Sequence, residues 1–150
     1  MVFHFLILSG ESEDFVLELQ LHQKNSFLDF HHAIIEALNF DSNNLASFWK
    51  TDENWQKISE ATLIDMDEHS KHLMKDINIE DWCSNKGERF LYIFDYFSER
   101  SLFIKIVNII DLENNISKYP TVVRLEGVVP LQTKRGEKYI DDLLNAFSSN

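Results

Sequence analysis

The fold is decided by the segment Phe90-Leu91-Tyr92-Ile93-Phe94-Asp95-Tyr96-Phe97. The polar residues 98–101 separate it from a second apolar run at residues 102–110. Two apolar runs joined by a short polar turn are typical of a β-hairpin. Since both runs are apolar at almost every position, we expect them to form central strands that are buried on both faces of a sheet.

A second hairpin is predicted at the start of the chain. Residues 2–8 form an apolar run, residues 9–14 form a polar turn, and residues 15–22 alternate between apolar and polar side chains. A period of two is typical of a strand with one buried face. The first run lacks a positively charged beginning, so we interpret it as a strand and not as a signal peptide.

A helix is predicted to begin after Ser26 and to end near Asn39. Ser26 and Asp29 have the spacing of a capping box, with Asp29 in place of the usual Glu. Apolar side chains then recur on one face of this helix, at Phe27, Phe30, Ile34 and Ala37. A short strand is expected at residues 45–50.

The remaining segments are less regular. Residues 51–76 are strongly polar and are expected to be loop or weak helix, and a short helix is expected to run through Trp82 and Cys83. An irregular strand is expected at residues 122–125. Residues 138–147 predict a terminal amphipathic helix, whose apolar face fits both packing on the sheet and docking to a partner and consists of Tyr139, Ile140, Leu143, Leu144 and Phe147.

Together these segments predict an α+β fold in a single domain, residues 1–150, with a polar insertion at about residues 51–76. The expected sheet is mixed or antiparallel and contains two hairpins and a short strand. One central helix and the C-terminal helix are expected to pack on it. The order hairpin, helix, strand also fits a β-grasp-like arrangement.

Charge and composition exclude several classes of protein. The formal net charge of the 150 residues is −11, whereas nucleic-acid binders neutralise phosphates with clustered Lys and Arg. Direct nucleic-acid binding is therefore disfavoured, and a basic partner or an apolar contact is expected instead. A single cysteine, Cys83, allows no internal disulfide and favours the cytoplasm. No apolar stretch approaches the roughly 18 residues that a membrane span needs.

Three ordered stretches between Val2 and Gln132 resemble a known family. The first is Asp29-Phe30-His31 with Ala33-Ile34, Ala37-Leu38-Asn39-Phe40-Asp41 and residues 45–48; the second is the strand 90–96; the third is Tyr119-Pro120 with Val123, Gly127, Pro130 and Gln132. They are similar to the plasmid pRiA4b open-reading-frame-three-like family, whose members are also called insertion-element passenger or resolvase-type proteins. The resemblance implies an α+β fold and a cytoplasmic, bacterial, mobile-element-associated setting. It implies no activity, because the family is uncharacterised.

The chain departs from the family pattern at one turn. Where the family has Gly-Asp-x-Trp followed by His, this sequence has Phe97-Ser98-Glu99-Arg100, and Leu102 stands near the expected His. The acidic tail of the family is also missing after Pro130. If the family cluster forms a site, we expect this chain to have lost its chemistry.

Asp95 is the carboxylate with the most unusual position. It interrupts an apolar strand, where a charge is costly unless it is paired or hydrogen-bonded. Arg89, Arg100 or Lys105 could pair with it, which gives a structural interpretation. The functional interpretation is an acid with a perturbed pKa in a pocket.

The histidines allow a structural and a functional interpretation as well. His31 flanks the apolar stripe of the predicted helix and is either a satisfied, partly buried side chain or a partner of Asp95 in acid–base chemistry. His69 and His72 could share a helical face with a nearby carboxylate and bind a metal, although a solvated polar loop also explains them. Cys83 is expected to be a small buried hydrophobe.

We predict a non-enzymatic protein-binding module without catalytic, cofactor-binding or metal-binding residues. Trp49 and Trp55 are candidate exposed anchors, since interfaces are enriched in Trp, although core packing also explains them. Arg100, Asp95 and His31 are the remaining candidates for an interaction site or pocket. The alternatives are a small metal-dependent or acid–base enzyme and a DNA-linked accessory factor. The sequence makes no prediction about the oligomeric state.

Overall fold

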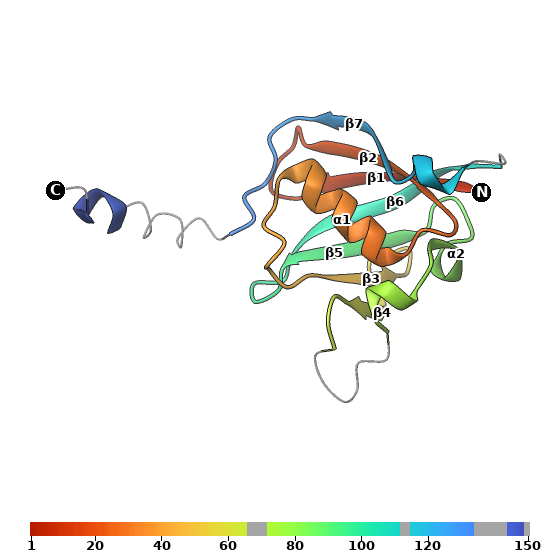
Figure 1. Cartoon of the computed structure of the whole chain (residues 1–150), viewed down its shortest axis with the longest axis horizontal. Coiled ribbons are helices and arrows are strands. Elements are labelled where there is room, and N and C mark those ends of the chain that lie inside the picture. Colours follow the sequence, from red (N-terminus) through yellow and green to blue (C-terminus); the bar gives the residue numbers. More distant parts are fainter. Residues whose placement is uncertain (66–71, 112–114, 134–143, 149–150) are drawn as a thin grey trace.

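A computed structural model describes residues 1–65, 72–111, 115–133 and 144–148. The strands and helices of the main body run along the chain as follows: β1 (Val2–Ser9), β2 (Val16–His22), α1 (Phe27–Leu38), β3 (Ser47–Thr51), β4 (Lys57–Thr62), η1 (Met74–Asp76), α2 (Ile79–Trp82), β5 (Arg89–Asp95), β6 (Arg100–Ile110), η2 (Ile116–Lys118) and β7 (Thr121–Glu126). Figure 1 shows these elements along the chain.

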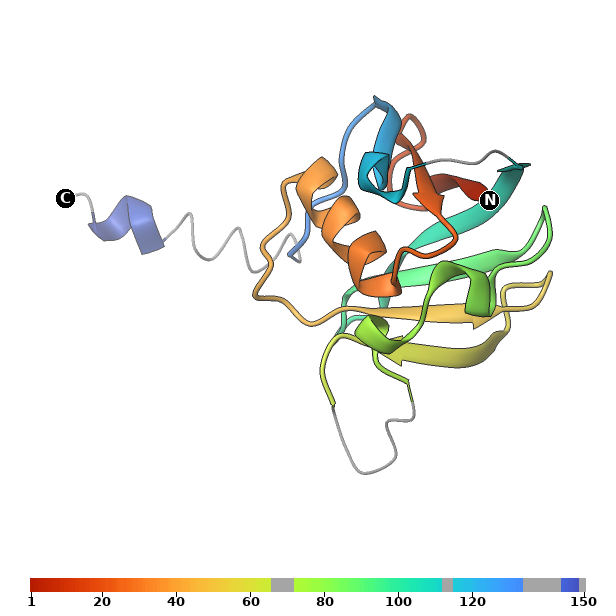
Figure 2. The same cartoon turned by 45° about the vertical axis from the view of Figure 1, so that its right-hand side comes forward.

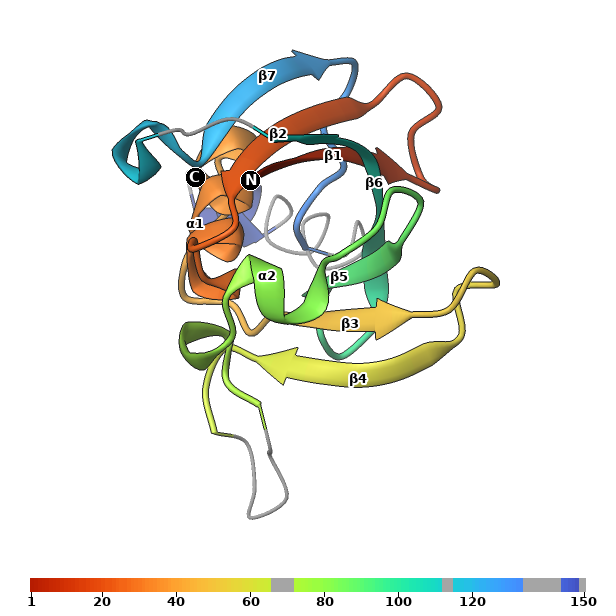
Figure 3. The same ribbon diagram turned by 90° about the vertical axis from the view of Figure 1, so that its right-hand side faces the viewer.

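The seven strands form one sheet in the order β4-β3-β5-β6-β1-β2-β7. Every pairing between neighbours is antiparallel, and β5 and β6 lie near the middle, as the apolar runs predict. The sheet curls strongly, and α1 lies within its concave side (Figure 3). The arrangement leaves β4 and β7 as the two edges, at opposite sides of the domain (Figure 1).

The hydrophobic core lies between α1 and the concave face of the sheet. The alternating strands send one row of side chains into it, including Phe5 from β1, Phe48 from β3 and Phe90 from β5. The Phe30 ring lies 4.7 Å from Phe5 and 4.9 Å from Phe48, between ring centroids. Offset and tilted ring pairs of this kind add to the free energy of apolar burial.

Local sequence signals fix both ends of α1. The Ser26 hydroxyl accepts a hydrogen bond from Asp29 N at 3.0 Å, and the Asp29 carboxylate accepts one from Ser26 N at 2.9 Å. This is the predicted capping box. At the other end Asn39 adopts a left-handed conformation with φ 55°, which terminates the helix. The segment containing η1 and α2 packs beside the start of α1 (Figure 2), where Phe27 N donates to Ile77 O.

The α+β class, both hairpins, α1, β3, α2 and β7 are confirmed. The expectation for residues 51–76 is wrong in part, because residues 57–62 form the edge strand β4. The order of hairpin, helix and strand is that of the β-grasp-like arrangement considered, and the sheet is antiparallel in every pairing, so the antiparallel alternative to a mixed sheet is the one formed. Within the described range, no helix is long and apolar enough to cross a membrane.

The predicted terminal helix is described at residues 144–148, which are helical and exposed. Leu144 and Phe147 are exposed and are not part of the hydrophobic core, so the expected packing of this helix on the sheet is not seen at these residues. Residues 138–143 of that prediction lie outside the described residues.

Candidate functional site

His31 is buried in the core. It is 2% exposed, and its Nδ1 forms a 2.8 Å hydrogen bond with the Tyr92 hydroxyl from β5. Burial lowers the pKa of the His31 imidazole to about 4, and the neighbouring His32 adds to that effect. Burial also raises the pKa of the Tyr92 hydroxyl. The pair holds α1 on β5 and matches the structural interpretation of His31.

Asp95 and Arg100 face each other across the β5–β6 turn. Arg100 Nη1 lies 3.4 Å from Asp95 Oδ2, so Arg100 is the partner among the three predicted cations. The guanidinium makes its shorter bonds elsewhere, donating to Glu11 at 2.8 Å and to the carbonyl of Leu131 at 2.6 Å. The Glu11 hydrogen bond is the largest cause that raises the pKa of Arg100. Arg100 thus ties together the turn after β1, the turn after β5 and the segment after β7.

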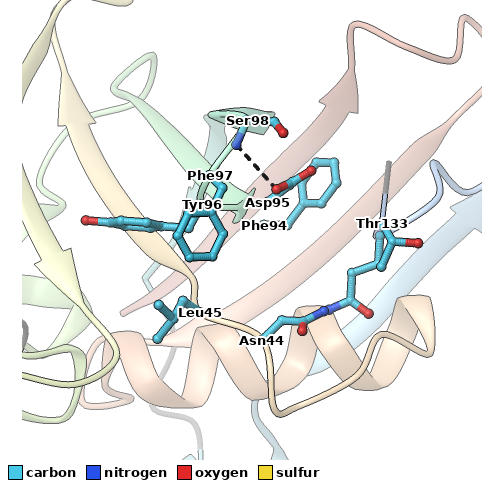
Figure 4. Close-up of a pocket in the computed structure, with 9 residues that line it drawn as sticks. Asn44, Leu45, Phe94, Asp95, Tyr96, Phe97, Ser98 and Thr133 are labelled. Carbon is cyan, nitrogen blue, oxygen red and sulfur yellow. Dashed lines mark hydrogen bonds between the residues drawn. The ribbon is translucent and has the colours of Figure 1, made fainter. Parts of the chain in front are cut away.

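A pocket of about 140 Å³ lies beside this cluster. The β5–β6 turn supplies most of its wall, and the loop after α1 and the segment after β7 complete it; the lining residues are Asn44, Leu45, Phe94, Asp95, Tyr96, Phe97, Ser98, Gln132 and Thr133. Figure 4 shows Asp95 and Ser98 on one side of the space and Asn44 and Leu45 on the other. The pocket stands at the turn where this chain departs from the family pattern.

Gln132 lies at one end of the pocket, in the segment of residues 131–132 that we call the strap. Its side-chain oxygen accepts a hydrogen bond from Asp41 N at 2.6 Å, and its amide donates to Asp41 O at 2.9 Å. Arg100 also donates to Gln132 O at 3.3 Å. The strap thereby fixes residues 131–132 against the loop that follows α1.

The pocket does not unite the predicted acid–base pair. Asp95 lines it, whereas His31 is not among the lining residues. Within the described residues, no group of three or more His, Cys, Asp and Glu side chains could hold a metal ion. His69 lies outside the described residues, and the ring of His72 packs edge-on against Trp82 at 5.8 Å. Cys83 is buried, and burial raises the pKa of its thiol.

Trp49 and Trp55 are half-buried on the side of the sheet that faces away from α1. Lys57 Nζ lies 5.0 Å from the Trp49 ring centroid. The Trp55 ring packs edge-on against Phe103 at 5.1 Å, and the Arg89 guanidinium lies 5.0 Å from the Trp55 ring. Both rings are therefore covered in part by neighbouring side chains of this chain, so neither stands out as a free anchor.

The edge strand β7 carries an apolar surface that the sequence analysis did not identify. Val122 and Val123 are each 49% exposed, and Leu125 is 41% exposed. In the described part of the chain β7 pairs with β2 alone, so its outer backbone groups have no strand beside them. An unpaired edge with exposed apolar side chains is a template for another strand.

The fold and these features define an antiparallel α+β domain with α1 on the concave face of its sheet, a small pocket at the β5–β6 turn and exposed apolar side chains on the edge strand β7. The chain belongs to the family described as plasmid pRiA4b ORF-3-like protein, whose sequence model matches residues 6–150. No curated protein matches it.

A solved structure shares the fold. It is a protein of unknown function, MM3350, from Methanosarcina mazei Go1, with a TM-score of 0.67 and 19% sequence identity. The match covers 83% of this chain and 68% of that chain. The similarity supports the arrangement of strands and assigns no activity.

Glu11, Tyr92 and Gln132 are the residues of these clusters that sequence reasoning missed as site residues. Each contacts its partner across a long stretch of chain: 89 positions for Glu11 and Arg100, 61 for His31 and Tyr92, and 91 for Asp41 and Gln132. Tyr92 and Gln132 carry a signal in the sequence: Tyr92 places a hydroxyl in an apolar run, and Gln132 is one of the residues that resemble the family.

Proposed function

We propose that this protein is a non-enzymatic binding module that takes up an extended segment of another protein along the free edge of β7. The observation that carries the proposal is the exposure of Val122, Val123 and Leu125 on a strand whose outer edge is unpaired. In strand addition, backbone hydrogen bonds supply affinity and alternate side chains supply specificity. The six residues of β7 offer both.

The register with β2 defines the side chains that an added strand would meet. Val122 stands opposite Leu19 and Leu125 opposite Leu17, so both lie on the core side of the sheet. Arg124 stands opposite Glu18 on the other side. An incoming strand would therefore cover apolar side chains on one face and meet charged side chains on the other.

The charges around β7 favour a basic partner. Arg124 is already paired with Glu126 at 2.8 Å and with Glu18 at 3.5 Å, which leaves one negative charge in this group of three. Glu13 and Asp14 lie in the turn before β2, and the backbone of Asp14 lies against Gly127 at the end of β7. With a net charge of −11 the whole chain attracts cationic segments. The partner segment is thus apolar on one face and basic on the other.

The setting that we propose is bacterial, cytoplasmic and associated with a mobile element. The plasmid protein in the family's description and the single buried cysteine support it. Direct contact with nucleic acid remains disfavoured by the charge.

The test is a quantitative capture from native lysate with three baits: the wild type, Val123→Lys on β7 and Ile58→Lys on β4. Ile58 is the matched control, because it is an apolar residue, 60% exposed, on the opposite edge. A charge that must be covered by an added strand blocks edge pairing. We expect a stoichiometric partner with the wild type and Ile58→Lys and its loss with Val123→Lys. Equal capture by all three baits would refute strand addition at β7.

A further inference from the structure

We propose that the pocket at the β5–β6 turn binds a primary ammonium group, R–NH₃⁺. The inference is independent of strand addition, because β7 contributes nothing to the lining of this pocket. It rests on a largely buried carboxylate with weak partners, an amide oxygen across the space, aromatic walls and a fitting volume.

The first observation is the poor compensation of Asp95. Its side chain is 14% exposed, and its contacts, from Ser98 N and from Arg100 Nη1, are both 3.4 Å long. Ordinary N–H···O bonds are about 2.7–3.2 Å, and bonds to a carboxylate are shorter still. A carboxylate that is this buried is costly unless it is well paired, so the site favours a further cation.

The charges around Asp95 also favour a further cation. Arg100 gives its short hydrogen bonds to Glu11 and to the carbonyl of Leu131. Glu11, Asp95 and Arg100 together carry two negative charges and one positive charge, which leaves one negative charge in the cluster. None of the residues that line the pocket is Lys or Arg. The missing positive charge is the one that a bound ammonium group would supply.

The second observation is a further acceptor among the lining residues, the side-chain oxygen of Asn44. An ammonium group has three donors and no acceptor. The carboxylate of Asp95 and the side-chain oxygen of Asn44 are two acceptors among the lining residues, on opposite sides of the space (Figure 4).

The walls and the size fit the carbon chain behind the ammonium group. Phe94, Tyr96 and Phe97 line the pocket, and Phe97 is 90% exposed, so a ligand would cover its ring. Aromatic faces attract cations, and the Arg100 guanidinium already lies 4.8 Å from the Phe94 ring. The volume of 140 Å³ holds about four to five non-hydrogen atoms at roughly 30 Å³ each, which is the length of an aminobutyl group.

Two sources carry this group: a lysine side chain of another protein and a free alkylamine. The probes are N-acetyl-lysine methylamide for the first and n-butylammonium for the second, titrated into the full chain and followed by NMR shifts of the Ser98 and Phe97 amides. N-acetyl-norleucine methylamide, which lacks the charge, is the ligand control. We expect saturable shifts with the charged probes, at millimolar affinity for so small a group.

Two substitutions make the titration decisive. Asp95→Asn preserves the shape of the side chain and is expected to weaken binding tenfold or more, because it removes the charged acceptor. Glu99→Gln removes a negative charge from the same turn without touching the pocket and is expected to leave binding within about twofold. Thermal unfolding of both variants checks that the fold is kept.

Tighter binding of N-acetyl-lysine methylamide than of n-butylammonium identifies a protein side chain as the source, and the reverse order identifies a free amine. The proposal is overturned if neither charged probe gives saturable shifts, if the norleucine probe gives the same shifts, or if Asp95→Asn binds as the wild type does. Failure here is distinguishable from failure of strand addition, since Val123→Lys leaves this pocket intact.

Discussion

The two edges of the sheet differ in how they are protected. At β4, Lys57 and Glu60 bring charges to the edge, and Thr62 N donates to His72 O, so that the segment after β4 covers the end of the strand. At β7, the single charged side chain within the strand interior, Arg124, is engaged by Glu18 and Glu126. Three apolar side chains of β7, those of Val122, Val123 and Leu125, are exposed.

The difference favours β7 over β4 as the edge at which a partner strand would add. Charged residues and covering segments are the ordinary means by which a sheet edge avoids pairing with another chain. Both edge strands are six residues long and both pairings contain a register shift, so these features do not separate the two edges. The β4 edge also has charged side chains and a covering segment, whereas at β7 the charge of Arg124 is taken up by Glu18 and Glu126. We therefore expect a partner strand to add at β7 and not at β4.

The largest expected effect comes from Gly127→Ala, which would detach the end of β7. Gly127 has φ 80°, and a Cβ at this position would collide with the backbone of Asp14. We expect a loss of about 3 kcal/mol or more in the free energy of unfolding, measured with urea. Gly87→Ala is the control, because Gly87 also has a positive φ but open space around it. It should cost only about 1–2 kcal/mol, and equal losses in the two variants would contradict the close approach at Gly127.

The contact between α1 and β5, by contrast, is expected to make the free energy of unfolding depend on pH. The pKa of His31 is lowered from 6.5 to about 4 in the folded protein, so the unfolded chain binds the proton more readily. The stability that neutral His31 contributes is therefore present above pH 6.5 and is lost as the pH falls toward 4. The full loss is about 3 kcal/mol at 1.36 kcal/mol per pKa unit.

The measurement is the unfolding free energy of the wild type and His31→Gln between pH 4 and pH 7. Gln keeps a hydrogen-bonding side chain opposite the Tyr92 hydroxyl but does not titrate. The gap between the two curves should shrink or reverse toward pH 4. A gap that is constant with pH would show that His31 does not titrate as described.

A smaller effect is expected at the strap. Gln132→Ala removes two hydrogen bonds to the backbone of Asp41, and the expected loss is about 1 kcal/mol, since such bonds contribute roughly 0.5–1.5 kcal/mol each and the site is partly exposed. Gln56→Ala, at an exposed position in the β3–β4 turn, is the control and should change the free energy of unfolding little. Equal effects in the two variants would contradict a strap that fixes residues 131–132.

The smallest effect on stability is expected from the binding variants. Val123→Lys and Ile58→Lys each replace an exposed side chain, so both should unfold within about 0.5 kcal/mol of the wild type. This near-equality is what lets the capture experiment separate binding from folding. A large destabilisation by Val123→Lys alone would mean that Val123 stabilises the fold rather than a partner.

The sequence predicts well those parts of the fold that depend on neighbours in the chain. The alternation from Phe15 to Leu21 gives β2, the Ser26 and Asp29 pair gives the start of α1, and the apolar run before Asp95 gives β5. Each signal has a period or a fixed spacing that its element requires.

β4 is missed because its sequence, Lys57-Ile58-Ser59-Glu60-Ala61-Thr62, has no clear apolar alternation. An edge strand has a neighbour on one side only and needs less apolar surface. The structure of β4 therefore depends on its pairing with β3 and not on an apolar pattern in its sequence. The pairing of Asp95 with Arg100 is foreseen from the cost of a buried charge, and the choice among three cations is settled by the turn geometry.

The pocket could be predicted only in part. Asp95 and Arg100 are identified from the sequence, but the wall contributed by Gln132 depends on a contact with Asp41 across 91 positions. Such contacts follow from the packing of distant segments and leave no local pattern. The exposure of β7 is likewise a consequence of the strand order, which places it at the edge of the sheet.

The central claim is tested most directly by amide hydrogen exchange of the protein alone and in complex with its captured partner. We expect the partner to slow exchange of the β7 amides at residues 121–126 and to leave exchange of the β4 amides at residues 57–62 unchanged. Protection of β4 with no change in β7, or protection of neither edge by a bound partner, would contradict the assignment of recognition to β7.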